Sequence, residues 1–176
     1  IKSIKQKSGK SGDLVFVTVA PQIFQHDTSC IEEEHDIVYR SAPDRNAAVP
    51  IYETSDTSPE FSYTVNPDPV LLFRYSALTF NGHRIHYDQP FCIETEGYEG
   101  LVVHGPLLAT MMLDLVRQNF PDAVVQYFQF RALAPVFDTL KFEVCGRQTS
   151  ALEVEIWIRR EDGVLAMSGS AKLSRT

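Results

Sequence analysis

Residues 81–88, with the sequence Asn-Gly-His-Arg-Ile-His-Tyr-Asp, bring together side chains that can move protons. An amide, two imidazoles, a guanidinium and a carboxylate follow an apolar segment that begins with a proline. A hydrophobic core does not need this mixture, whereas sites of acid–base chemistry do. An imidazole can take and return a proton near neutral pH, so His86 is the principal candidate for a catalytic base.

The neighbours of His86 are candidates for orienting roles. Asn81 carries an amide that does not titrate, so it can position a water or a substrate carbonyl but cannot act as a base. His83 is read equally well as a loop residue that fixes the backbone and as a group that meets substrate. Asp88 could orient His86 or simply cap the chain. Arg74 and Arg84 could each bind a substrate carboxylate through two hydrogen bonds, or pair with an acidic side chain of the protein.

A second candidate region runs from Gly97 to Ala109, where a glycine-rich turn leads into an expected helix. Free N–H groups at a helix N-terminus attract negative charge. Pro106 has no N–H, so the Gly105 amide is the expected donor to an oxygen that becomes enolate-like. Alone, Gly105 would be read as an N-cap. His104 stands beside it and is a candidate for contact with substrate.

Two helices should position these groups. The first should begin after Asp68 as N-cap with Pro69 at its first position. Its expected buried face consists of Val70, Leu71, Leu72, Phe73 and Tyr75. The second should run from Pro106 to near Asn119, before Pro121. Its apolar residues recur at three- and four-residue spacing, which is typical of an amphipathic helix: Leu107, Leu108, Met111, Met112, Leu115 and Val116.

The rest of the chain is predicted to be mainly β-structure. Strands are expected at residues 14–23, 30–40, 61–65, 124–130, 140–147, 152–160 and 164–173. The first two should pair across a turn at 26–29, and the last two across Glu161-Asp162-Gly163, because Asp-Gly suits a tight turn. Residues 1–12 are expected to be a solvated lead-in, and the proline-containing stretch 41–60 a linker. One long helix followed by antiparallel strands indicates a curved sheet wrapped around that helix.

Composition excludes several classes of protein. Of 176 residues, 44% are hydrophobic, enough for a core, and the net charge of −7 argues against nucleic-acid binding. The apolar runs are too short to span a bilayer. Three widely spaced cysteines, Cys30, Cys92 and Cys145, indicate free thiols in a reducing compartment. Glu94, Glu96 and the histidines lie close in sequence, but no metal-ligand spacing occurs, so no metal is expected. No P-loop, dinucleotide-binding or nucleophile-elbow motif is present.

The run from Asn81 to His86 resembles the catalytic loop of the MaoC-like, R-specific enoyl-CoA hydratases, which have the hot-dog fold. In that family an Asp, an Asn, a Pro, an aliphatic residue and the catalytic His follow one another, and here Asn81, His83, Arg84, Ile85 and His86 occupy those positions. Residues 103–107 are similar to the start of the family's central helix, whose glycine amide lines the oxyanion hole. The match is closest to a branch that holds 3-hydroxyacyl-thioester dehydratases and mesaconyl- and itaconyl-CoA hydratases.

The resemblance implies an α+β hot-dog domain at residues 61–176, with residues 1–40 as the closing strands of an incomplete N-terminal copy in a double hot-dog. It implies reversible hydration of a 2-enoyl thioester to a 3-hydroxyacyl thioester, with CoA or an acyl-carrier protein as the acyl carrier and no separate cofactor. A homodimer in the cytoplasm or mitochondrial matrix is the expected setting. Asn81 departs from the family's Asp, which leaves His86 as the principal base. A hot-dog thioesterase and a non-catalytic assembly subunit are the alternatives.

Overall fold

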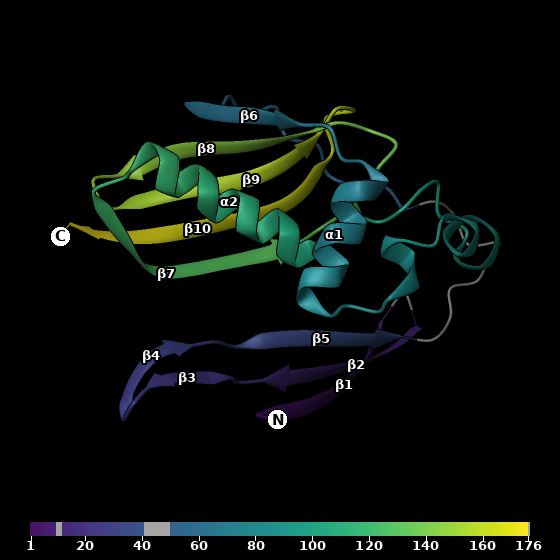
Figure 1. Ribbon diagram of the computed structural model, residues 1–176, viewed down its shortest axis with the longest axis horizontal. Helices are drawn as coiled ribbons and strands as arrows, with labels where there is room; N and C mark the ends of the chain where they lie inside the picture. Colours follow the sequence, from purple (N-terminus) through teal and green to yellow (C-terminus); the bar gives the residue numbers. More distant parts are fainter. Residues whose placement is uncertain (10–11, 41–49, 176) are drawn as a thin grey trace. The chain divides into compact units, whose positions relative to one another are not determined.

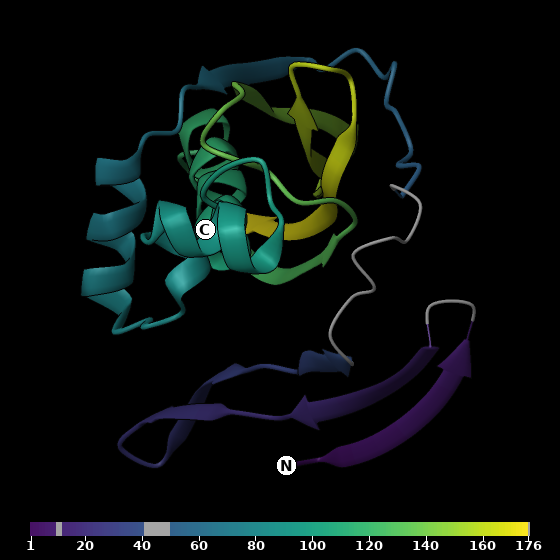
Figure 2. The same ribbon diagram turned by 90° about the vertical axis from the view of Figure 1, so that its right-hand side faces the viewer.

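The computed structural model describes residues 1–9, 12–40 and 50–175. The chain divides into two units, Ile1–Val49 and Pro50–Thr176, and each is described by itself. Figures 1 and 2 trace the course of the chain through both units. No helix in the described ranges is long and apolar enough to cross a membrane.

The first unit is made of antiparallel strands. They are β1 (Ser3–Gly9), β2 (Gly12–Val19), β3 (Gln22–Gln25), β4 (Thr28–Glu32) and β5 (His35–Arg40). One sheet has the order β1-β2-β5, and β3 pairs with β4. The expected pairing across a turn is confirmed, but the turn consists of residues 26 and 27 only, and His26 adopts a φ of 52° there. Each expected strand is interrupted, the first between β2 and β3 and the second between β4 and β5.

The prediction that residues 1–12 form a solvated lead-in is wrong. Ser3 to Gly9 form β1, and Ile4 lies opposite Val17 of β2. The lysines and serines of this segment are weak strand formers, but lysine is well tolerated on an exposed edge strand. Hydrogen bonds from β2 therefore decide the conformation, and composition does not reveal such a partner.

The second unit is one five-stranded antiparallel sheet with a helix on its concave side (Figure 1). Its strands are β6 (Phe61–Val65), β7 (Ala123–Ala132), β8 (Phe142–Ser150), β9 (Glu153–Arg160) and β10 (Leu165–Arg175). The order β6-β8-β9-β10-β7 leaves β6 and β7 at the edges. The predicted hairpin is confirmed: β9 pairs with β10, and Gly163 has a φ of 86° in the turn.

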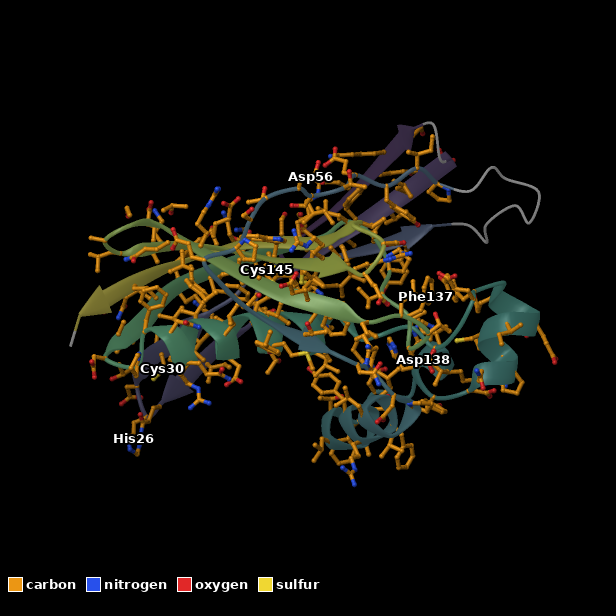
Figure 3. The ribbon with its side chains drawn as sticks, turned by 90° about the horizontal axis from the view of Figure 1, so that it is seen from above. His26, Cys30, Asp56, Phe137, Asp138 and Cys145 are labelled. Carbon is orange, nitrogen blue, oxygen red and sulfur yellow. The ribbon has the colours of Figure 1, made fainter. Side chains whose placement is uncertain are left out.

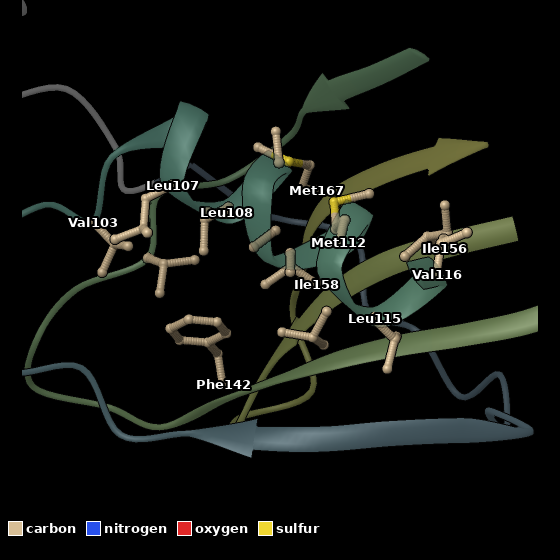
Figure 4. Close-up of a cluster of buried hydrophobic side chains, with 14 of the residues drawn as sticks. Val103, Leu107, Leu108, Met112, Leu115, Val116, Phe142, Ile156, Ile158 and Met167 are labelled. Atoms are coloured by element: carbon tan, nitrogen blue, oxygen red, sulfur yellow. The ribbon is translucent and has the colours of Figure 1, made fainter. Parts of the chain in front are cut away.

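The core lies between the sheet and helix α2 (Gly105–Asn119) (Figure 4). Alternate residues of β8 and β9 point to the helix because side chains alternate across a strand. The buried side chains include Leu108, Met112, Leu115, Val116, Phe142, Val144, Val154, Ile156 and Ile158. Burying each contributes about 1.5–3 kcal/mol to the hydrophobic stabilisation, which fixes α2, and with it the N-terminus of that helix, against the sheet.

Between β6 and α2 the chain forms three short helices: α1 (Pro69–Thr79), η1 (Arg84–His86) and η2 (Phe91–Glu96). They gather near the N-terminal end of α2 (Figures 1 and 2). The predicted start of α1 is confirmed, because the Asp68 side chain accepts a hydrogen bond from the Leu71 N–H. The predicted buried face is partly wrong. Val70 and Phe73 are exposed, whereas Leu72 and Ser76 are buried.

The stretch expected as a linker is described only from residue 50 onwards, and residues 41–49 lie outside the described ranges. Three backbone hydrogen bonds tie its later part to the sheet. Ser55 N–H donates to Gly163 O (3.0 Å), Glu60 N–H donates to Gly146 O (2.9 Å), and Glu53 O accepts from Leu165 N–H (2.8 Å). Residues 53–60 therefore run along the sheet of the second unit.

Candidate active site

The loop after α1 is shaped by its own hydrogen bonds. Phe80 ends the helix with a φ of 53°, and the Asn81 N–H donates to Ser76 O at 2.9 Å. The side-chain oxygen Oδ1 of Asn81 then accepts the His83 N–H at 3.0 Å, which closes a local turn. The amide NH₂ of Asn81 is left as the donor of that side chain. The loop therefore uses one end of the Asn81 amide for structure and keeps the other for a ligand.

His86 sits on η1 with only 8% of its surface exposed. Its Nδ1 lies 2.7 Å from the Val102 carbonyl oxygen. A carbonyl can only accept, so Nδ1 must carry the proton, and in the neutral ring Nε2 keeps a free lone pair. Burial, the largest effect, lowers the pKa of His86, and the charge of His83 lowers it further. The ring is thus held neutral near pH 7 in the tautomer that a general base needs.

The Val102 carbonyl belongs to a segment, residues 101–105, that leads into α2. Val102 N–H donates to Ile85 O at 2.9 Å, and Val103 N–H donates to Val136 O at 2.8 Å. The Asp138 carboxylate accepts the Leu101 N–H at 2.8 Å (Figure 3 shows Asp138). These bonds fix the backbone atom that orients His86.

His104 stacks on His86. The two ring centroids are 3.7 Å apart with an interplanar angle of 17°. His104 has no exposed surface, and its Nε2 lies 2.8 Å from the Ser76 hydroxyl oxygen. Burial, and secondarily the neighbouring His86, lowers the pKa of His104 to about 4. His104 is therefore uncharged near neutral pH.

Gly105 follows His104 and is the first residue of α2. The first N–H groups of a helix have no partner within it, and they mark the positive end of its dipole. A Cβ built on Gly105 would meet nothing within 4 Å, and the residue does not have a positive φ. Neither packing nor backbone strain requires glycine here. The open space beside its Cα is what a ligand needs to approach the amide.

The two arginines considered for substrate binding, Arg74 and Arg84, are less favourably placed for that role. Arg84 donates from Nη2 and Nε to the Asp88 carboxylate (2.7 and 2.9 Å), and its guanidinium carbon lies 4.1 Å from the Phe91 ring centroid. Asp88 also accepts the Phe91 N–H at 3.1 Å, and the bond from Arg84 is the main reason that the pKa of Asp88 is lowered. Asp88 is thus a cap and an ion-pair partner, and Val102 takes the orienting role considered for it.

Arg74 is exposed and lies two residues before Ser76 on α1. Two residues correspond to about 200° of rotation in a helix, so Arg74 projects roughly opposite to the face that meets His104. Substrate binding by Arg74 or Arg84 stays a prediction. His83 is exposed too, with its ring edge-on to His86 at 5.6 Å between centroids. Among the described residues, no group of three His, Cys, Asp or Glu side chains could hold a metal ion.

The structure thus brings His86, His104 and Gly105 together and places Asn81 and His83 on the adjoining loop. Three contributors were not identified from the sequence: Ser76, the Val102 carbonyl and Asp138. The buried position of Ser76, four residues after Leu72 on α1, could have pointed to a polar partner. A backbone carbonyl has no signature in sequence. Asp138 follows Leu101 by 37 positions, so their contact is not predictable from sequence spacing.

Comparisons with known proteins identify the family of the chain. The family model described as hydroxyacyl-thioester dehydratase type 2 matches residues 1–138. A mesaconyl-C(4)-CoA hydratase of Chloroflexus aurantiacus is 46% identical over 98% of this chain and 61% of its own length. A mitochondrial hydroxyacyl-thioester dehydratase type 2 of Schizosaccharomyces pombe is 36% identical over 74% of this chain and 42% of its own length.

A solved MaoC-like dehydratase from Phytophthora capsici superimposes with a TM-score of 0.71 at 14% identity, over 98% of this chain and 60% of that one. At that identity the likeness shows the fold alone, which is the hot-dog fold. The chain belongs to the hydroxyacyl-thioester dehydratase type 2 family. It spans less than two thirds of the length of the two curated relatives named above.

Proposed function

We propose that the protein catalyses the reversible addition of water to a 2-enoyl thioester, which gives a 3-hydroxyacyl thioester. The observation that carries this proposal is the neutral His86 ring, whose Nε2 lone pair is kept free by the bond from Nδ1 to Val102 O. It stands beside a helix N-terminus that begins with Gly105. A base beside an anion-binding amide is what this addition requires.

In the forward direction, His86 Nε2 takes one proton from a water molecule while the water oxygen bonds to C3 of the substrate. The electron pair of the C2–C3 double bond moves toward the thioester carbonyl, and the Gly105 N–H donates to the resulting enolate oxygen. Such a donor is worth about 3 kcal/mol in the transition state. His86 then returns its proton to C2, so atoms and charge balance. The Asn81 NH₂ donates to the attacking water.

The acyl group and the acyl carrier of the substrate are part of this proposal, and similarity to the relatives supports them. Similarity to the mesaconyl-C(4)-CoA hydratase supports a C5 dicarboxylic acyl-CoA as the substrate of this chain. Similarity to the dehydratase of S. pombe supports a 3-hydroxyacyl thioester. We place both within one proposal, with CoA or an acyl-carrier protein as the thiol. Recognition of a second carboxylate by Arg84 would require it to exchange Asp88 for the substrate.

The test is an assay at the enoyl-thioester absorbance band with crotonyl-, mesaconyl- and itaconyl-CoA, for wild type and His86→Asn. Asparagine can place an N–H near the position of Nδ1 and keep the bond to Val102, but it has no group at Nε2. We expect a loss of about 10²- to 10⁴-fold in kcat. His35→Asn, a change of an exposed histidine on β5, is the matched control and should retain wild-type activity.

Each alternative has its own outcome in this assay. Release of free thiol would establish a thioesterase, whereas loss of the enoyl band without free thiol would establish hydration. Absence of both reactions with all three substrates, in a folded protein, would support a non-catalytic assembly subunit. The site favours the hydratase, because Asp88, the acidic side chain on the His86 loop, is committed to Arg84 and the Phe91 N–H.

Gly105→Ala tests the role of the helix N-terminus. The new methyl would project into space where no atom lies within 4 Å, so the fold should tolerate it. The same methyl would obstruct a thioester that approaches the amide, so kcat should fall about 10²-fold, as expected for loss of an oxyanion donor. Gly82→Ala has equally open surroundings and serves as the control for thermal stability. Unchanged kcat in Gly105→Ala would remove this amide from the mechanism.

We also propose a homodimer in a reducing compartment, the cytoplasm or the mitochondrial matrix. Strand β7 is an edge of the sheet and exposes Val124, Tyr127 and Phe130 to 44%, 49% and 47%. An unpaired, apolar edge strand is a template for pairing with another chain. The free thiols of Cys30, Cys92 and Cys145 suit a reducing compartment.

A further inference from the structure

We propose that Ser76 and His104 are positioning residues for His86: the Ser76 hydroxyl orients the His104 ring, and this ring is the surface on which the His86 imidazole is held. The inference rests on the proposed function, because it assigns His86 the role of base. It concerns two residues that do not themselves take or give a proton in the reaction.

The His104 ring is constrained from three directions. Its Nε2 lies 2.8 Å from Ser76 Oγ, its face lies 3.7 Å from the His86 centroid, and the Tyr75 ring meets it edge-on at 4.8 Å with an angle of 63°. Ser76 and Tyr75 come from α1, whereas His104 precedes α2. The stack therefore fixes the loop that carries His86 relative to two separate helices.

His86 needs this second constraint because one hydrogen bond does not fix a ring. The bond from Nδ1 to Val102 O leaves rotation about the bond axis, and such rotation would turn Nε2 away from a substrate. A flat ring stacked at 17° removes that freedom. The tautomer of His86 thus depends on Val102 O, and the orientation of its ring depends on His104.

A histidine at position 104 carries a cost that a phenylalanine would avoid. Its Nδ1 is buried and has no hydrogen-bond partner among the described residues. Buried polar atoms without partners are unfavourable, so packing alone does not account for an imidazole here. The bond to Ser76 does account for it, because a phenyl ring could stack but could not be turned by a hydroxyl.

Ser76 and His104 do not form a nucleophile and its base. No acidic side chain is hydrogen-bonded to His104 Nδ1, and the lowered pKa of His104 makes it a weak proton acceptor. The ring also stays neutral beside His86, so a protonated His86 would face an uncharged aromatic surface.

The test is a double-mutant cycle in kcat with Ser76→Ala, His104→Phe and the double variant. Ser76→Ala should lower kcat about tenfold with little change in KM, which is the size expected for one hydrogen bond. In the His104→Phe background the same change should have no further effect, because Ser76 then has no imidazole to orient. Thr79→Val removes a different hydroxyl of α1, one that donates to Tyr75 O, and is the matched control.

A second readout does not depend on activity. In ¹⁵N spectra of the imidazoles, His86 should be in the Nδ1–H tautomer in wild type and in Ser76→Ala, because Val102 O accepts from Nδ1 in both. The ¹⁵N shifts of His104 and of the stacked His86 ring should change in Ser76→Ala, because the His104 ring loses the partner that orients it. Equal losses of kcat from Ser76→Ala in both backgrounds, or unchanged kcat and spectra, would overturn the inference. If wild type does not hydrate any substrate, the proposed function fails, and the spectra alone decide whether Ser76 orients these rings.

Discussion

At His86 and His104, burial decides the protonation state, and no carboxylate of the described residues is bonded to either ring. Burial is the largest cause of the lowered pKa of both residues. The two rings differ in which nitrogen is hydrogen-bonded, because their partners differ. Nδ1 of His86 donates to a carbonyl, which leaves Nε2 for chemistry, whereas Nε2 of His104 faces a serine. In the proposed mechanism, one of these two identical side chains is the base and the other supports it.

The lowered pKa of His104 predicts a loss of stability in mild acid. Its pKa is about 4 in the folded protein and about 6.5 in the unfolded chain. Between these values the unfolded chain binds more protons, so the free energy of unfolding falls as pH decreases from about 6.5 to 4. The total contribution is on the order of 3 kcal/mol, and His86 acts in the same direction.

Urea unfolding of wild type and His104→Phe at several pH values across this range checks the prediction. Phenylalanine does not titrate, so the variant should lose less stability on acidification than wild type. Parallel pH dependences for the two proteins would mean that His104 is protonated in the folded state as readily as in the unfolded chain.

Sequence predicts side chains at this site better than it predicts their partners. The density of polar groups in residues 81–88 identified His86 and its loop. The Val102 carbonyl could not be found in this way, because every residue has one. Asp88 lies two residues after His86 and is therefore the nearer candidate for orienting it. However, Asp88 also lies four residues after Arg84 on a helical turn, and this spacing favours an ion pair between them.

At the scale of elements, the site depends on the segment 101–105, which is held by Asp138. The Asp138 side chain accepts the Leu101 N–H, and its backbone N–H donates to Leu101 O at 3.0 Å. Asp138→Ala removes the first bond and should lower the free energy of unfolding by about 1–3 kcal/mol. It should also lower kcat, because the displaced segment carries both Val102 O and His104.

Asp138→Asn is the matched control for this prediction, since its side-chain oxygen can still accept the Leu101 N–H. Gly100→Ala should damage the same contact by another route, because its Cβ would lie 2.6 Å from Asp138 Oδ1 and 2.7 Å from Thr139 Cγ2. Urea unfolding and the hydration assay measure both effects. Equal stability of Asp138→Ala and Asp138→Asn would show that this bond does not hold the segment.

Elements were predictable where local chemistry and packing agree. Helix α2 is predicted by the position of Pro106, the spacing of its apolar residues and Pro121. The observed helix begins one residue earlier, at Gly105. Phe73 on α1 shows the opposite case: a short helix that is apolar on most sides does not reveal which side is buried. Strand β1 depends on a partner strand, so its own residues gave no signal.

At the scale of the whole molecule, the sheet of the second unit ends at β7 with its outer hydrogen-bonding groups unpaired by any described strand. Exposed apolar side chains on such an edge favour association with a second chain. If β7 forms the contact of a homodimer, charged side chains on it should prevent association, because pairing would bury them. The variant is Val125→Lys combined with Tyr127→Lys, at positions that are 36% and 49% exposed.

Light scattering during size-exclusion chromatography measures the result. Wild type should have twice the mass of one chain, and the double lysine variant should have the mass of a single chain with an unchanged circular-dichroism spectrum. Leu152→Lys is the matched control, because Leu152 is 42% exposed in the turn that joins β8 and β9 and does not belong to the edge strand. A dimer that survives both lysines would place the contact on another surface. A wild-type monomer that hydrates its substrate would show that one chain contains the complete site.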